Sequence, residues 1–463
     1  MSIARPDSTD STHSPAHCPA QSLARLLHAI DTRDWAAARR QLGDHVEIDY
    51  RSLFGGAPQL VDANALIEQW RGMLTPLHST QHLLGTPCVA IDGERAVVEA
   101  PVRGDHVAHG LPDGEQWMVA GMYTAHFERH DDRWVLTSLR LDAHHQTGNR
   151  QLLAQAGERM RSLPVGDGFS CELVHLSSMG DRIIGHLYLP SSTRGPVPGV
   201  VVLGSWTTVK EQMAGLYAQR LAQRGYAALA FDPRGHGQSA GALRNVESPA
   251  AKIEDVRAAA AFLARDPRVS GAGVGALGIC AGAGYVAGAA LDSPEISSVA
   301  LVAPWLHDRG LVEAIYGGPE GVQKRRAWAE AALQRLAQTG EIEYVPAVST
   351  TDERAAMFGA FEYYLDPARG AIDAWPNAFA TMAWTEWLEF DPHPFAERLE
   401  QPVMIVHSEQ GAVPEGARRF HARLSGPKEI RWLGGTQFDF YDDPPHVAEA
   451  VSIVAEHFAE ARR

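Results

Sequence analysis

Hydrophobic and polar positions follow two different rhythms along the chain. In the first third, helical patterns at Gln21–Leu42 and Asp62–Leu74 precede a series of runs in which apolar and polar residues alternate. Alternation with a period of two is typical of strands with one buried face, so these runs predict an antiparallel, curved sheet. The runs are Ser79–Leu84, Cys88–Ile91, Ala96–Val107, Gln116–Arg129 and Arg133–Asp142. Helices followed by a meander predict an α+β cone.

In the rest of the chain, short runs are apolar throughout and alternate with helical patterns. Parallel strands that are buried on both faces require such uninterrupted apolar runs. The runs are Pro198–Gly204, Tyr226–Asp232, Val274–Ile279, Ser298–Ala303 and Val403–His407, with helical patterns at Lys210–Arg224 and Ile253–Leu263. This alternation predicts an α/β fold, a parallel sheet with helices on both faces.

A cysteine flanked by glycines ends the third of these runs. The segment Gly278–Gly282 fits the G-x-nucleophile-x-G turn between a strand and a helix, called the nucleophile elbow. The sulfur of Cys280 takes the place of the usual serine oxygen. The N-terminal end of the following helix predicts a lowered pKa for this thiol. The alternative is an inert cysteine buried at a glycine-rich strand end.

The elbow and three other motifs resemble a dienelactone-hydrolase-related branch of the α/β-hydrolases that includes fungal polyketide transferases. The motifs are Gly204–Gln212, Phe231–Ser239, Gly278–Gly282 and Phe438–Asp442, and the resemblance covers roughly residues 168–463. It implies a Cys-His-acid or Ser-His-acid triad that acts on esters, thioesters or lactones. Two backbone N–H groups must then stabilise the oxyanion, and the candidates are Ala281 with either Ser205 or Trp206. Trp206 could equally be a packing residue.

The remaining triad positions depart from the family's pattern. Gly411 stands where a typical member carries an aspartate, which leaves Glu409 as the candidate acid, and Gln437 stands where the histidine is expected. A glutamine side chain accepts no proton near neutral pH, so the general base is missing. Histidines elsewhere in this domain that could replace it are His236, His407 and His446.

Three interpretations of function stay open. A thiol is intrinsically nucleophilic, so Cys280 could support an acyltransferase or a hydrolase without a histidine. The hydrolase domain could instead be degenerate and only bind, or the first domain could carry the chemistry. An insertion at about residues 305–399 is rich in aromatic residues and predicts a helical cap with an apolar acyl pocket over Cys280. The expected substrate is therefore bulky and hydrophobic, and the family resemblance implies a polyketide-like one.

The first domain resembles the SnoaL-like group of the nuclear transport factor two-like superfamily, which includes polyketide cyclases and scytalone dehydratase. The resemblance rests on Asp34-Trp35, Asp49-Tyr50, Thr80-Gln81-His82 and Gly121-x-Tyr123. It implies an apolar cavity with a few inward polar groups. Candidates for its lining are Asp49, Tyr50, His82, Trp117, Tyr123 and His144. Asp49 with His82 would suit proton abstraction or dehydration of the cyclase, dehydratase or isomerase type. The alternative is that these are ordinary strand residues.

Length and charge limit the class of protein. At 463 residues the chain exceeds the size of a single hydrophobic core. We therefore expect a disordered segment at 1–20, a SnoaL-like domain at 21–147, a linker at 148–167 and a hydrolase domain at 168–463. The formal net charge of −15 argues against nucleic acid and anionic membranes as partners. The expected partner is a small-molecule acyl substrate, and the SnoaL-like resemblance allows a homodimer through the N-terminal domain.

Cysteine usage and glycine motifs bear on cofactors and compartment. Cys18, Cys88, Cys171 and Cys280 never approach C-x-x-C spacing, and the glycines near Cys280 lack the Lys-Ser/Thr of a phosphate loop. We expect no metal and no cofactor. No apolar signal sequence opens the chain, which together with the scattered cysteines predicts a cytoplasmic protein.

Overall fold

The computed structural model describes residues 18–108, 111, 113–130, 133–161, 163–192 and 195–462. Most of the segment predicted to be disordered, residues 1–17, lies outside this range. The chain divides into two units between residues 162 and 163. In the described part of the chain, no helix combines the length and the apolar character needed to cross a membrane.

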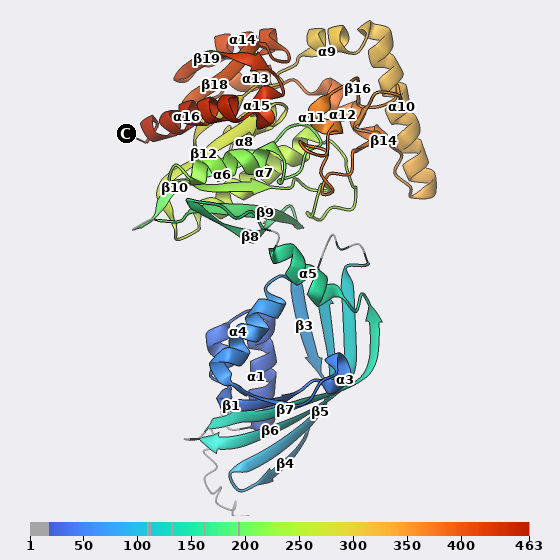
Figure 1. The fold of residues 1–463 in the computed structure, drawn as a ribbon. Helices are drawn as coiled ribbons and strands as arrows, with labels where there is room; N and C mark the ends of the chain where they lie inside the picture. Colours follow the sequence, from blue (N-terminus) through green and yellow to red (C-terminus); the bar gives the residue numbers. More distant parts are fainter. Residues whose placement is uncertain are drawn as a thin grey trace, which may run out of the picture. The chain divides into compact units, whose positions relative to one another are not determined.

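The first unit is a curved seven-stranded sheet with helices packed against it (Figure 1). Its helices are α1 (Pro19–Asp31), α2 (Trp35–Arg39), α3 (Arg51–Phe54), α4 (Ala63–Leu74) and α5 (Leu152–Arg161). Its strands are β1 (Leu42–Asp49), β2 (Gln59–Asp62), β3 (Ser79–Leu84), β4 (Cys88–Asp92), β5 (Arg95–Val107), β6 (Gln116–His130) and β7 (Arg133–Gly148). They lie in the order β2-β1-β7-β6-β5-β3, with β4 also paired to β5. This arrangement confirms the predicted α+β cone.

Local sequence explains most of these elements. Asp62 caps α4 by accepting hydrogen bonds from the N–H groups of Asn64 and Ala65, and Asp34 caps α2 in the same way. The alternating residues of β5 turn a row of small apolar side chains toward α1. Neither α3 nor β2 was predicted, because the first is a single turn and the second is an almost wholly exposed edge strand. Helix α5 lies in the segment predicted as a linker, and it contributes Leu152 and Ala156 to the core of this unit.

The second unit contains an eight-stranded sheet in the order β19-β18-β13-β12-β10-β11-β9-β8. The strands are β8 (Phe169–Ser178), β9 (Asp181–Pro190), β10 (Val197–Leu203), β11 (Ala227–Phe231), β12 (Val269–Ile279), β13 (Ile296–Val302), β18 (Val403–Gln410) and β19 (Lys428–Thr436). The helices around it are α6 (Met213–Ala222), α7 (Pro249–Ala264), α8 (Gly282–Ala290), α14 (Pro414–Arg423), α15 (Asp439–Asp442) and α16 (Pro444–Glu460). Strands β10 to β13, β18 and β19 run parallel, whereas β9 pairs antiparallel with β11 and β8. The predicted α/β-hydrolase fold is confirmed, with an additional antiparallel hairpin.

The segment between β13 and β18 forms the predicted cap at one end of this unit, with α10 along its outer side (Figure 1). Its helices are α9 (Arg309–Ile315), α10 (Gly318–Thr339), α11 (Glu362–Leu365), the 3₁₀ helix η1 (Thr381–Ala383), α12 (Trp384–Glu389) and α13 (His393–Ala396). Two short strand pairs complete it, formed by β14 (Tyr344–Pro346) with β17 (Ala378–Ala380) and by β15 (Val348–Ser349) with β16 (Met357–Phe358).

Candidate functional site

Cys280 lies in the turn between the central strand β12 and helix α8. Its φ of 55° is in the left-handed region, which costs a residue other than glycine roughly 1–2 kcal/mol. Neighbouring segments hold this conformation: the Cys280 N–H donates to the Val302 carbonyl at 3.1 Å, and the Trp305 N–H donates to the Cys280 carbonyl at 2.9 Å. Strain that is retained at the end of a sheet strand is typical of a functional position.

The glycines on both sides of Cys280 are sterically required. A Cβ atom on Gly278 would lie 2.5 Å from the Gly282 carbonyl oxygen, and one on Gly282 would lie 2.4 Å from the carbonyl oxygen of Gly204. Only glycine therefore allows the elbow to pack against itself and against the end of β10.

The thiol of Cys280 is almost completely buried, with 6% of the residue exposed. Burial raises the pKa of the thiol, although hydrogen bonds from Ser205, Tyr441, Gln437 and the Ala281 N–H act in the opposite direction. The expected lowering of this pKa is therefore wrong: desolvation outweighs the helix N-terminus and the surrounding donors. At neutral pH the resting group is the thiol.

The loop after β10 brings Ser205 and Trp206 to the elbow. Tyr364 donates a hydrogen bond to the Ser205 hydroxyl at 2.9 Å, and the Tyr441 hydroxyl lies 3.3 Å from the same oxygen. Among the described residues, the N–H groups of Ser205, Trp206 and Ala281 donate to no other backbone group. None of the three candidate donors is thus bound to a described backbone acceptor. The ring of Trp206 packs among cap aromatics, including Trp387 at 4.8 Å between centroids.

Gln437 follows β19 and is buried next to the thiol. Its Nε2 donates to the Ala303 carbonyl at 2.8 Å and to the Tyr441 hydroxyl at 3.3 Å, and its Oε1 accepts from the Ala412 N–H at 2.8 Å. In a Ser/Cys-His-acid triad the loop after β18 would present an acceptor to the histidine. Here that loop presents the N–H donor of Ala412, which an amide oxygen fits.

The loop after β18 has no acid directed at this position. Glu409 is exposed and pairs with Arg418, and no hydrogen bond joins it to Gln437 among the residues described. At Gly411, where a family member would carry the acid, a Cβ atom would lie 2.7 Å from Cε1 of His407. An aspartate at this position therefore has no room unless the His407 ring or the loop moves.

The histidines proposed as replacements are bonded elsewhere. His407 contacts the Ala412 carbonyl and stacks on a tryptophan, His446 pairs with Asp443, and buried His236 contacts the Arg234 carbonyl. The hydroxyls beside Cys280 also supply no base, because burial raises the pKa of Tyr364 and Tyr441 well above the usual value and keeps both groups protonated. Among the described residues, the groups around the thiol donate hydrogen bonds and offer no base.

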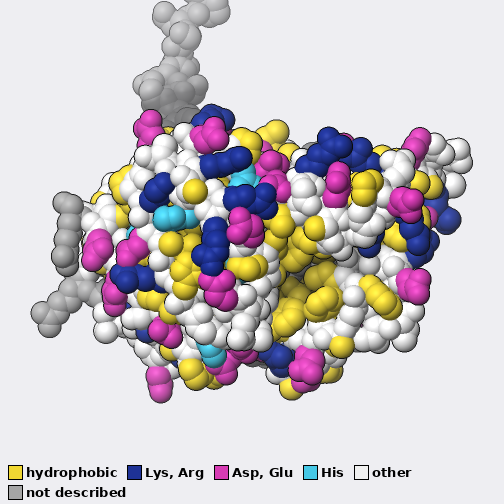
Figure 2. All heavy atoms as spheres, turned by 90° about the horizontal axis from the view of Figure 1, so that it is seen from above, with side chains coloured by type: hydrophobic (Ala, Val, Ile, Leu, Met, Phe, Trp, Pro, Cys, Tyr) yellow, Lys and Arg dark blue, Asp and Glu magenta, His cyan; other side chains and the backbone are white. Residues whose placement is uncertain are grey.

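The cap closes over this site from one side. Tyr364 reaches Ser205, the Trp375 indole donates to the Thr207 carbonyl at 3.1 Å, and Arg369 pairs with Asp442. Many of the cap's aromatic side chains pack against one another, since Trp384, Trp387 and Phe379 are fully or almost fully buried. The face seen in Figure 2 is hollowed near its middle, and hydrophobic side chains gather in the hollow.

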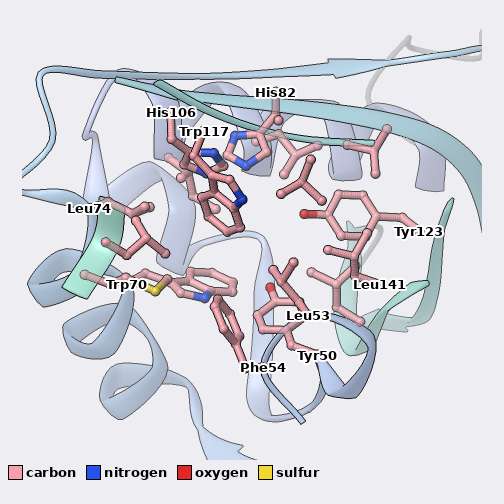
Figure 3. A pocket seen from close by; sticks show the side chains of 18 residues that line it. Tyr50, Leu53, Phe54, Trp70, Leu74, His82, His106, Trp117, Tyr123 and Leu141 are labelled. Carbon is pink, nitrogen blue, oxygen red and sulfur yellow. The ribbon is translucent and has the colours of Figure 1, made fainter. Parts of the chain in front are cut away.

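A second candidate site lies inside the cone. Its cavity is lined almost entirely by apolar and aromatic residues from α1, α3, α4, α5 and the sheet. His82 and His106 lie together on one wall, while the hydroxyls of Tyr50 and Tyr123 point into the space from other sides (Figure 3). Trp117 also lines the cavity, and its ring centroid is 4.8 Å from that of His106. The sequence predicts Tyr50, His82, Trp117 and Tyr123 as lining residues, but it does not predict His106.

The carboxylate partner of His82 is Asp31, at the end of α1. The His82 Nδ1 lies 2.7 Å from Asp31 Oδ1, the His82 N–H donates to Oδ2 at 2.7 Å, and Thr80 donates to Oδ1 at 3.0 Å. Burial opposes ionisation of Asp31, but these bonds keep the pKa of its carboxyl below the usual value. Burial lowers the pKa of His106 to about 4, so this imidazole is neutral. The result is an Asp-His pair at an apolar cavity.

Two residues predicted for the cavity lie elsewhere. Asp49 forms a bidentate ion pair with Arg51 and does not pair with His82. His144 is exposed and is not among the residues that line the cavity. The sequence marked Asp31 only as a break between helices, and no local signal shows that the end of α1 meets β3, 51 residues away.

Family models match both units. Residues 20–140 match the SnoaL-like domain, and residues 210–436 match the family described as serine aminopeptidase, S33. These matches follow the structural division.

Individual relatives cover about three fifths of this chain. Protein PA2218 of Pseudomonas aeruginosa is 29% identical over 57% of this chain and 73% of its own length, and its crystal structure has a TM-score of 0.56 over 65% of this chain and 96% of that chain. Thiohydrolase aneE of Aspergillus aculeatus is 28% identical over 63% of this chain and 91% of its own length. The α/β-hydrolase GrgF of a Penicillium species is 19% identical with a TM-score of 0.55, over 63% of this chain and 99% of its own, and supports the fold alone.

Proposed function

Because the chain joins a SnoaL-like domain to an α/β-hydrolase domain, we propose that its second unit transfers an acyl group by way of Cys280. The observation that carries the proposal is the strained elbow, which holds a thiol among the donors of Ser205, Tyr441 and the Ala281 N–H. These groups suit the negative charge of a tetrahedral intermediate. The similarity to α/β-hydrolases supports hydrolase or acyl-transfer chemistry in general.

The proposed step balances without a histidine when the leaving group is a thiolate. The Cys280 sulfur bonds to the acyl carbon, the bond from that carbon to the leaving sulfur breaks, and the proton of the Cys280 thiol passes to the leaving thiolate. A thioester therefore suits this site better than an alkyl ester, whose alkoxide would need an acid. The printed name of the thiohydrolase relative supports the same class of substrate.

The second half-reaction distinguishes transfer from hydrolysis. Attack of water on an acyl-cysteine needs a base to remove a proton, and the described residues near Gln437 provide none. We therefore expect a long-lived acyl-enzyme that a nucleophile stronger than water resolves. A bulky hydrophobic acyl group fits the aromatic cap.

Intact-protein mass spectrometry tests this proposal. The parent and Cys280→Ala are incubated with a panel of activated esters and acyl thioesters. The expected result is a stable acyl adduct on the parent that is absent from the variant. No adduct with any donor, or an equal adduct on both proteins, would overturn the proposal.

The Asp31–His82 pair favours a second candidate function, acid-base chemistry in the cone. A histidine oriented by a carboxylate at an apolar cavity could remove a proton next to a carbonyl group. The test is incubation with a panel of cyclic ketones in D₂O, with NMR detection of deuterium next to the carbonyl. Exchange that His82→Gln abolishes would support this function, and exchange that the variant leaves unchanged would refute it.

A further inference from the structure

Glu247, between β11 and α7, is a buried carboxylate with no place in the proposed acyl transfer. It is 0% exposed, and both of its oxygens accept hydrogen bonds from Lys252 Nζ at 2.7 Å. The Thr207 N–H donates to Oε2 at 2.9 Å, and the Tyr285 hydroxyl donates to Oε1 at 2.6 Å. A buried carboxylate with this many donors joins the segments that supply them.

Thr207 directly follows the predicted oxyanion donors Ser205 and Trp206. Its φ of 62° is in the left-handed region, where a β-branched residue is strongly disfavoured. Glu247 holds its N–H, and the Trp375 indole of the cap holds its carbonyl at 3.1 Å. The two bonds act on both sides of one strained residue and so fix the direction of the preceding peptide.

The other contact of Glu247 reaches the elbow helix. Tyr285 lies in α8, in the turn that follows Cys280, and its ring is fully buried. One carboxylate therefore connects the loop that carries Trp206 to the helix that carries the Ala281 N–H. The distance between two oxyanion donors decides whether both can reach the same oxygen.

We propose that Glu247 is a positioning residue for the oxyanion site of the hydrolase domain. It holds the 205–207 loop in its strained conformation and at a fixed distance from the elbow. It touches neither the thiol nor the acyl group. This inference rests on the proposed function, because the oxyanion site matters only if Cys280 is acylated.

The test separates two reactions of the same thiol. Acylation by p-nitrophenyl acetate passes through an oxyanion, whereas alkylation by iodoacetamide does not. Both rates are measured at Cys280 by peptide mass spectrometry, in a matched pair of variants: Glu247→Gln/Lys252→Met and Glu247→Leu/Lys252→Met. Both double variants lack the buried charges of positions 247 and 252, and their side chains are similar in volume. Only the glutamine variant keeps an acceptor for the Thr207 N–H.

The expected acylation rate of the leucine variant is about 100-fold below that of the glutamine variant, the usual effect of losing one oxyanion donor. The alkylation rates should agree within about twofold.

Glu211→Gln is the matched control, since Glu211 binds Lys210 nearby without touching the 205–207 loop. Its ratio of acylation to alkylation should equal that of the parent. Equal acylation in the two double variants, or a parallel fall in both reactions, would overturn the positioning role.

Hydrogen exchange provides a readout that does not depend on acylation. The Thr207 amide should exchange at least about tenfold faster in the leucine variant than in the glutamine variant, because its acceptor is gone. Equal exchange would refute the inference. A parent that forms no acyl adduct refutes the proposed function alone, and the exchange comparison then decides the role of Glu247.

If the double variants do not fold, Glu247→Asp shortens the side chain, keeps its charge and gives the same comparisons against the parent.

Discussion

The two candidate sites have complementary chemical equipment. The cone cavity contains an imidazole paired with a carboxylate but no cysteine or serine among its lining residues. The elbow has a strained thiol surrounded by donors, but no described base beside it. The first site is equipped to move protons, and the second is equipped to form a covalent bond and stabilise an anion.

This difference shows how the elbow is built when no histidine stands at position 437. The elbow, its glycines and the three candidate N–H donors are all retained. The space for the acid is closed by His407, and the base position is a hydrogen-bonded amide. Gln437 is therefore an integrated part of its surroundings and not a single replaced side chain.

The sharpest test of the comparison is a pair of variants, one for each site. Asp31→Asn should reduce any deuterium exchange catalysed by the cone by about 10²- to 10⁴-fold, because the imidazole loses its orienting carboxylate. Acylation of Cys280 should change less than about twofold, since the variant removes no group of the elbow. NMR and mass spectrometry measure the two activities, and Cys280→Ala should show the reverse pattern. If either variant abolishes both activities, the sites do not act separately.

The pH dependence of Cys280 alkylation should follow the raised pKa of its thiol. The thiolate fraction then rises roughly tenfold from pH 7 to pH 8, because the group is still mostly protonated in this range. Iodoacetamide rates at a series of pH values, read at the Cys280 peptide, measure this slope. A plateau below pH 8 would show a thiol with a lowered pKa and an undetected partner.

Gln437→His should not restore hydrolysis. The imidazole would have no acid at position 411, and the N–H of Ala412 would lose its acceptor. Loss of these buried hydrogen bonds should lower the free energy of unfolding by about 1–3 kcal/mol. Urea denaturation measures the stability, and the decay of the acyl adduct measures the hydrolysis. Faster decay with unchanged stability would contradict the structural role of Gln437.

The smallest effect is expected for Asp49→Asn. Asp49 pairs with Arg51 and does not line the cavity, so deuterium exchange by the cone should stay within about twofold of the parent. The same NMR measurement as for Asp31→Asn gives the comparison. A large loss for Asp49→Asn with none for Asp31→Asn would reverse the assignment of the acid-base pair.

The regular elements could be predicted from the sequence because their causes are local. The period-two runs became β3 to β7 with nearly the predicted ends, except that β7 continues six residues past Asp142 to Gly148. The apolar runs became parallel strands. Exceptions are the β8–β9 hairpin, the edge strand β19 and the short elements α3 and β2, whose patterns are weak. The glycines around Cys280 and the amide at Gln437 were also readable, since residue type and order define them.

Contacts between distant segments were decided only by the tertiary structure. The partner of His82 could be Asp31 or Asp49 until α1 packed beside β3, and nothing local in Glu409 shows that it turns to Arg418. The pKa of Cys280 is a further case: the sequence indicates the helix N-terminus, but burial, the larger effect, depends on the cap and the loops around it. Periodicity determines which residues form elements, whereas desolvation and pairing depend on what surrounds a group in three dimensions.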